Sequence, residues 1–130
     1  MKRIIIDTNF LLIPIQFKVD IFTEIDRICH FNYELSIFEK SIEELKDIIR
    51  EQSGKSKKAA QFALKLVKLK NIKMIKSNQG YVDSLILKNI NKNTIIATQD
   101  IKLKKELIER GASVIILRQK KYLQLIGKAL

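Results

Sequence analysis

Two aspartates of this 130-residue chain stand where apolar, β-branched segments end. Asp7 directly follows the segment at residues 2–6, and Asp100 comes two residues after the segment at 93–98. In parallel α/β sheets, ligands bind beyond the carboxyl ends of the strands, where the strand order reverses. Each aspartate taken alone is more often a cap for the next helix than a ligand. Together they make this edge of the sheet a candidate site.

Two further acids stand on the inner margins of expected helices. With about 100° of rotation per residue, Glu44 borders the buried arc of a helix at 39–50, whereas Glu43 points roughly opposite. Asp83 lies at the margin of the apolar face of a helix at 81–90, near its amino end. The simpler interpretation makes Glu44 an exposed helix acid and Asp83 a residue that favours the helix dipole.

Four carboxylates that meet without cations would repel one another and shift their pKa values upward, so such a cluster implies a bound metal ion. Oxygen-only ligands suit Mg²⁺ or Mn²⁺ rather than zinc. Mg²⁺ keeps several waters and can supply a hydroxide-like nucleophile to a phosphodiester, while it neutralises charge on the transition state. The four acids therefore predict a nuclease.

The segments that would position these acids alternate between strands and helices. We expect strands at 2–6, 33–37, 72–75, 93–98 and 113–117, and helices at 10–28 (interrupted by Pro14), 39–50, 57–70, 81–90 and 101–110, then a short tail helix. Such alternation predicts the α/β class, with a largely parallel sheet that is covered on both faces. The length fits a single domain over 1–130.

The charge is +11 and unevenly distributed, since residues 52–82 hold eight lysines and no acid. A basic surface attracts polyanions, so RNA or another nucleic acid is the expected partner, although a lysine-rich proteome would produce the same bias. The longest apolar run is about a third of the roughly 20 residues that span a bilayer, so we expect a soluble, cytoplasmic protein with no membrane partner. Cys29 is the only cysteine, which excludes an internal disulfide.

Four short motifs make the chain similar to a known family. They are IIIDTN at 4–9, SIEEL at 41–45, VDSLI at 82–86 and ATQD at 97–100, and they resemble the four motifs of the PIN domain in order and spacing. The resemblance covers essentially the whole chain. It implies a three-layer α/β/α fold with a central parallel sheet of five strands in the order 3-2-1-4-5. It also implies a metal-dependent ribonuclease that leaves 5′-phosphate and 3′-hydroxyl ends.

The same resemblance implies roles for individual residues. Many relatives carry a further acid where Lys102 stands, so we expect one Mg²⁺ or Mn²⁺ rather than two. The metal-binding and catalytic acids would be Asp7, Glu44, Asp83 and Asp100, and the residues that support them Thr8, Asn9, Ser41 and Thr98. From the charge distribution, the RNA-binding lysines would be Lys55, Lys57, Lys58, Lys102, Lys104 and Lys105.

Several functions remain open within this resemblance. The tail from Gly111 is most similar to the PIN nucleases of ribosomal RNA processing and their archaeal relatives. VapC-type toxins come next, and a toxin would bring an antitoxin partner; a homodimer also stays open. A nonenzymatic RNA-binding module of the same fold is a further alternative. A phosphoacceptor receiver domain is disfavoured because the adjacent acid pair after the first strand is missing.

Overall fold

A six-stranded sheet in the order β3-β2-β1-β4-β5-β6 lies at the centre of the computed structural model, which describes residues 1–77 and 80–127. Strands β1 to β5 are parallel, and β6 is antiparallel to β5. The expected α/β class and parallel order 3-2-1-4-5 are confirmed. The strands are β1 Lys2–Ile6, β2 Tyr33–Phe38, β3 Lys73–Ile75, β4 Thr94–Ala97, β5 Ser113–Arg118 and β6 Tyr122–Ile126.

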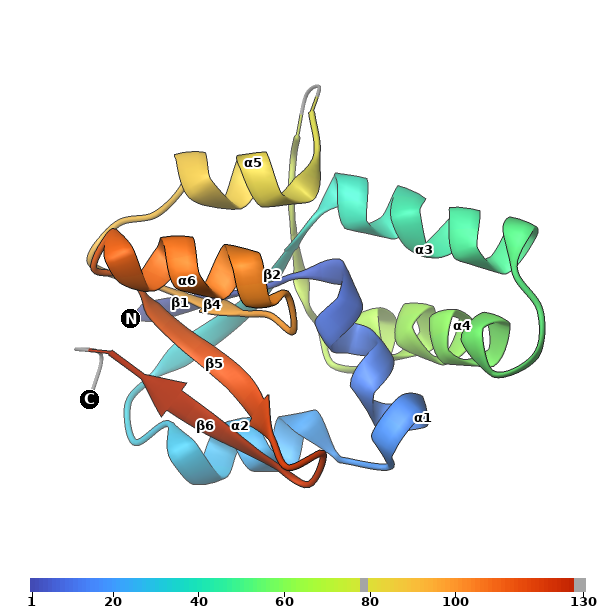
Figure 1. Cartoon of the computed structure of the whole chain (residues 1–130), viewed down its shortest axis with the longest axis horizontal. Coiled ribbons are helices and arrows are strands. Elements are labelled where there is room, and N and C mark those ends of the chain that lie inside the picture. Colours follow the sequence, from blue (N-terminus) through green and yellow to red (C-terminus); the bar gives the residue numbers. More distant parts are fainter. Residues whose placement is uncertain (78–79, 128–130) are drawn as a thin grey trace.

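Helices cover both faces of this sheet (Figure 1). Successive strand residues point to opposite faces, so an apolar strand places apolar side chains on both of them. Ile4 and Ile6 of β1 join one core cluster with η1, α1, α2, α3 and α4, whereas Ile5 joins another with α5 and α6. No helix of the described ranges is long and apolar enough to cross a bilayer. The helices are η1 Thr8–Leu12 (a 3₁₀ helix), α1 Ile13–Phe17, α2 Ile21–Ile28, α3 Glu39–Glu51, α4 Gly54–Leu69, α5 Val82–Lys88 and α6 Ile101–Glu109.

The strand order reverses at β1, which lies between β2 and β4. The last residues of β1 and β4 are register partners, since Ile6 pairs with Ala97. The two chain segments that leave these strands therefore start side by side. Figure 1 shows the first turns of η1 (blue), α3 (cyan), α5 (yellow) and α6 (orange) converging beyond this edge of the sheet.

The tail differs from the expectation, because it forms strand β6 instead of a short helix. Gln119 and Lys120 have φ of 51° and 55°, so the chain reverses in a tight turn directly after β5. Leu123 is buried and Gln124 exposed, the alternation typical of a strand with one covered face. The sheet consequently has six strands rather than five. A smaller correction concerns α4, which begins at Gly54 rather than at residue 57.

Candidate active site

Asp7 lies at the centre of the candidate site, directly after β1, and its side chain is only 8% exposed. Its backbone N–H donates to the carbonyl of Ala97 at 2.9 Å, which continues the β1–β4 pairing by one residue. The Thr8 N–H donates to Asp7 Oδ1 at 2.9 Å, and the Thr98 hydroxyl donates to Asp7 Oδ2 at 2.7 Å. Both carboxylate oxygens are thus fixed by the ends of the two central strands.

Glu44 reaches the same place from α3. The Thr8 hydroxyl hydrogen-bonds to Glu44 Oε1 and lies 2.8 Å from Ser41 Oγ. Because Thr8 has one hydroxyl proton, Ser41 supplies the proton for the second contact whenever Thr8 donates to Glu44. Ser41 is fully buried one turn before Glu44. Glu43, in contrast, is exposed and forms an ion pair with Lys40 at 3.2 Å.

Asp100 both caps a helix and borders the site. As the N-cap of α6, its Oδ1 accepts a hydrogen bond from the Leu103 N–H at 3.0 Å. Its own N–H donates to Thr98 Oγ1 at 3.0 Å. Thr98, which is 1% exposed, therefore binds Asp7 and the backbone of Asp100 at once. The predicted role of Thr98 as a support for metal-binding acids stays a prediction.

The four predicted acids line one cleft of about 390 Å³. Asp83 lies in the first turn of α5, where its Oδ1 accepts a hydrogen bond from the Ser84 N–H at 2.9 Å. Tyr81, just before α5, is 76% exposed on the same lining. Asn9 also lines the cleft, and its backbone carbonyl accepts a hydrogen bond from Gln99 at 2.7 Å.

A fifth acid in this cleft, Asp47, is missing from the sequence expectation. It follows Glu44 by three residues on α3, so the two side chains share one helix face. This spacing is the signal that could have found it. Asp47 is ion-paired with Arg50, whereas the four predicted acids form no ion pair within the described ranges. Asp47 is therefore the one cleft carboxylate whose charge is already balanced.

The surroundings raise the pKa of Asp7 above its ordinary value of 3.8. Burial is the main cause, because it disfavours the charged carboxylate. The hydrogen bonds from Thr98 and Thr8 oppose this effect, and the charges of Glu44 and Asp100 add to it. These two acids thus act electrostatically on Asp7 in the folded chain.

The chemistry of the lining residues suits a hard divalent cation. Every charged residue that lines the cleft is a carboxylate, and no lysine or arginine of the described chain is among the lining residues. Carboxylate oxygens are the ligands that Mg²⁺ and Mn²⁺ prefer. Within the described ranges, however, no three His, Cys, Asp or Glu side chains are grouped so that they could hold one metal ion. The carboxylate oxygens are suitable ligands for such a cation. In this structure, however, the carboxylates accept hydrogen bonds from neighbouring protein groups.

The predicted RNA-binding lysines lie outside the acidic cleft. Lys57, Lys58, Lys102 and Lys105 are exposed near the amino-terminal ends of α4 and α6. Lys55 donates to the backbone carbonyl of Gln16 at 3.2 Å. Lys104 is half-buried and lines a second cavity.

Comparison with known proteins identifies similar sequences. Residues 4–120 match the model of a family described as PIN like domain. A curated relative, Ribonuclease VapC4 of Methanocaldococcus jannaschii, is 35% identical over 129 residues, which cover 98% of each chain.

Solved structures share the architecture at lower sequence identity. The PIN domain endonuclease Utp24 aligns with a TM-score of 0.79 and 20% identity, over 97% of this chain and 92% of that one. A domain of a functionally unknown protein from Methanocaldococcus jannaschii aligns with a TM-score of 0.58 and 18% identity, over 91% and 92%. At these identities, the two matches show a common fold.

Proposed function

This chain belongs to the PIN-like domain family, and from that membership we propose that it is a metal-dependent endoribonuclease that hydrolyses RNA phosphodiester bonds. The observation that carries the proposal is the cleft lined by Asp7, Glu44, Asp83 and Asp100, without lysine or arginine among its described lining residues. An anionic RNA would be repelled by such a cleft unless a cation were bound there first. The VapC4 relative is named a ribonuclease, which supports RNA as the substrate.

In this proposal, Asp7, Glu44, Asp83 and Asp100 would hold Mg²⁺ or Mn²⁺. When bound, the cation would supply neutralisation of charge on the reacting phosphate and a water molecule of lowered pKa. The chain's own residues orient the acids. Thr98 and the Thr8 N–H fix the two oxygens of Asp7, so its carboxylate cannot rotate freely. Thr8 and Ser41 hold Glu44 toward Asp7. Asp100 Oδ1 accepts the hydrogen bond that caps α6, so Oδ2 is the oxygen that would bind the metal ion.

Lysines of α4 and α6 would hold the RNA backbone outside the cleft. A phosphate contact from a lysine contributes mainly by releasing counterions, and this contribution does not depend on the sequence. We include in this role the lysines at the amino-terminal ends of α4 and α6, namely Lys55, Lys57, Lys58, Lys102, Lys104 and Lys105.

Two cellular roles are compatible with this activity. Ribosomal RNA processing, in the cytoplasm, rests on the similarity of the tail that was noted from the sequence. A VapC-type toxin, with an antitoxin partner, is favoured by the curated relative of that name. Induced expression separates the two roles, because a toxin arrests growth of the host and is neutralised by its antitoxin, whereas a processing enzyme leaves growth intact.

The activity is tested by RNA cleavage with and without Mg²⁺ or Mn²⁺, in wild type and Asp7→Asn. This substitution removes one charge but keeps the shape of a side chain that is held from both sides. We expect cleavage that requires the metal and falls by at least about a hundredfold in the variant, which should stay folded by circular dichroism. Undiminished cleavage by a folded, nuclease-free Asp7→Asn preparation would contradict the assignment. No cleavage by wild type with either metal would favour the nonenzymatic RNA-binding module.

A further inference from the structure

A second cavity, of about 450 Å³, has three basic side chains on a lining that is otherwise apolar or neutral. Lys104 of α6, Arg118 at the end of β5 and Lys120 in the turn before β6 all line it, and no acid of the described chain does. None of these three cations forms an ion pair within residues 1–77 and 80–127. Three uncompensated cations on one cavity wall repel one another, and an anion would relieve this repulsion.

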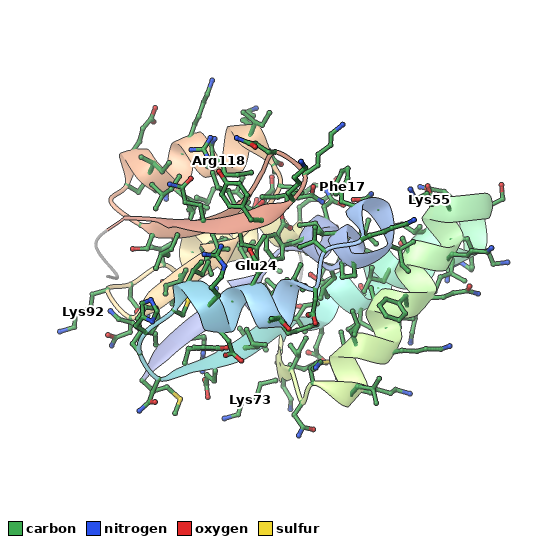
Figure 2. The ribbon with its side chains drawn as sticks, turned by 90° about the horizontal axis from the view of Figure 1, so that it is seen from below. Phe17, Glu24, Lys55, Lys73, Lys92 and Arg118 are labelled. Carbon is green, nitrogen blue, oxygen red and sulfur yellow. The ribbon has the colours of Figure 1, made fainter. Side chains whose placement is uncertain are left out.

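The three cations have defined positions. Arg118 Nε donates to Gln124 Oε1 at 2.7 Å, and the other two guanidinium nitrogens make no hydrogen bond within the described ranges. The Lys120 ammonium lies 5.8 Å from the centre of the Phe17 ring, a cation–π contact that links the turn to the end of α1. Figure 2 shows Phe17 and Arg118 on the same side of the molecule. The free guanidinium nitrogens can still bind an anion.

Residues 98–100 separate this basic cavity from the acidic cleft. Thr98 lines the basic cavity, yet its hydroxyl donates to Asp7 Oδ2 and accepts from the Asp100 N–H. Gln99, also on the basic lining, donates to the carbonyl of Asn9, which is a residue of the acidic cleft. An extended anion bound at one site would therefore reach the other after passing this short segment.

We propose that the second cavity binds backbone phosphates of the RNA strand that flank the bond cut in the acidic cleft. This inference rests on the proposed function and specifies how that site receives its substrate. Lys104, Arg118 and Lys120 would bind the phosphates on one side of the cut. They would fix the register of the strand without selecting its sequence, because phosphate contacts carry no sequence information.

Binding is measured in the Asp7→Asn background, so that cleavage does not interfere. The probe is a fluorescein-labelled single-stranded oligouridylate, titrated at several salt concentrations. The combined variant Lys104→Gln, Arg118→Gln and Lys120→Gln should bind it roughly tenfold or more weakly at low salt, and the slope of log affinity against log salt should fall by about two units, at about 0.7 per contact. The matched control, Lys46→Gln with Lys88→Gln and Lys92→Gln, removes the same charge from exposed positions outside this cavity. It should leave the slope within about half a unit of the parent.

Several outcomes would overturn this inference. An unchanged slope in the cavity variant would do so, and so would equal losses in the cavity variant and the control, which would show a general charge effect. A cavity variant that loses binding to phosphatidylserine vesicles but not to RNA would point to a membrane surface instead. Melting temperatures show whether the triple variant is destabilised. If it is, Arg118→Lys serves as a second variant, because it retains the charge and should keep most of the salt slope.

Failure of the proposed function gives a different result. If wild type cleaves no RNA with either metal, the nuclease proposal fails. If wild type cleaves but the cavity variant binds like its parent, only the inference about the second cavity fails.

A second readout follows from the geometry. A dinucleotide is too short to pass residues 98–100 and fill both sites, so its cleavage should be nearly equal in wild type and the cavity variant.

Discussion

The Thr8 hydroxyl connects the strand-end acid to helix α3, because it hydrogen-bonds to Glu44 while the Thr8 N–H binds Asp7. Of the adjacent acids Glu43 and Glu44 in α3, only Glu44 contacts Thr8. We therefore expect Glu44→Gln to lower metal-dependent RNA cleavage by at least about a hundredfold, since it removes a charge from the cleft. Initial rates of cleavage at saturating Mn²⁺ measure the effect.

Glu43→Gln is the matched control for that substitution. Glu43 is exposed and pairs with Lys40, and surface ion pairs contribute about 0–1 kcal/mol. The cleavage rate of Glu43→Gln should stay within about twofold of wild type, because a loss of about 0–1 kcal/mol at the surface is too small for a tenfold change in rate. Equal losses in both variants would show that the side of α3 that faces the site has been misassigned.

The buried Asp7 should make stability depend on pH. Its folded pKa lies above the ordinary 3.8 because of burial, so between these two values the folded chain binds more protons than the unfolded chain. The free energy of unfolding therefore rises as the pH falls through the folded pKa, and the ionised Asp7 costs stability at neutral pH. Without divalent ions, Asp7→Asn should melt above wild type at pH 7, and this difference should shrink toward pH 3.8.

Melting curves from pH 7 down to pH 4 in a chelating buffer test this expectation. Glu51→Gln changes an exposed acid at the end of α3 and should keep the wild-type pH dependence. A melting temperature of Asp7→Asn at or below that of wild type at neutral pH would show that the hydrogen bonds to the carboxylate outweigh its burial.

At the scale of elements, α1 ends on a strained residue. Lys18, its C-cap, has φ 57° and ψ 42°, the left-handed region that costs roughly 1–2 kcal/mol for an L-residue. Glycine avoids this cost but loses more backbone entropy on folding. Lys18→Gly should raise the free energy of unfolding by about 0.5–1 kcal/mol, or roughly 2–4 °C in melting temperature. Lys18→Ala, which keeps the Cβ atom, should give no such gain.

The tail shows what the sequence could not supply about the elements. Strands β1 and β4 were predictable because their apolar runs are buried on both faces. The run at 122–126 is short, and its strand conformation depends on one neighbouring element and one distant element. One is β5, with Leu117 as the register partner of Leu123. The other is α2, where Glu24 accepts from the Leu123 N–H at 2.9 Å and Arg27 donates to its carbonyl at 3.1 Å. Together the two side chains cover part of an exposed sheet edge.

For the molecule as a whole, four of the five acids that line the cleft were predictable, whereas Asp47 and the basic cavity were not. Strand ends and helix faces follow from local patterns, so Asp7, Glu44, Asp83 and Asp100 could be placed before the fold was known. The basic cavity combines Phe17 of α1, Lys104 of α6 and Arg118 of β5, which come from three separate elements. A chain of net charge +11 thus keeps an acidic cleft beside a basic cavity, a separation that no composition reveals.

The repulsion among the acids of the cleft predicts that divalent ions stabilise the folded chain. In their absence, the buried Asp7 is repelled by the charges of Glu44 and Asp100, and a cation that binds only the folded state raises stability by about 2.7 kcal/mol at a hundredfold excess over its dissociation constant. Millimolar Mn²⁺ should therefore raise the melting temperature near neutral pH by several degrees, at roughly 4 °C per kcal/mol. Asp100→Asn should shrink the rise while keeping the α6 cap, because asparagine caps helices as well as aspartate does. NaCl at the same ionic strength controls for screening. A melting temperature that does not respond to Mn²⁺ would instead support a nonenzymatic RNA-binding module.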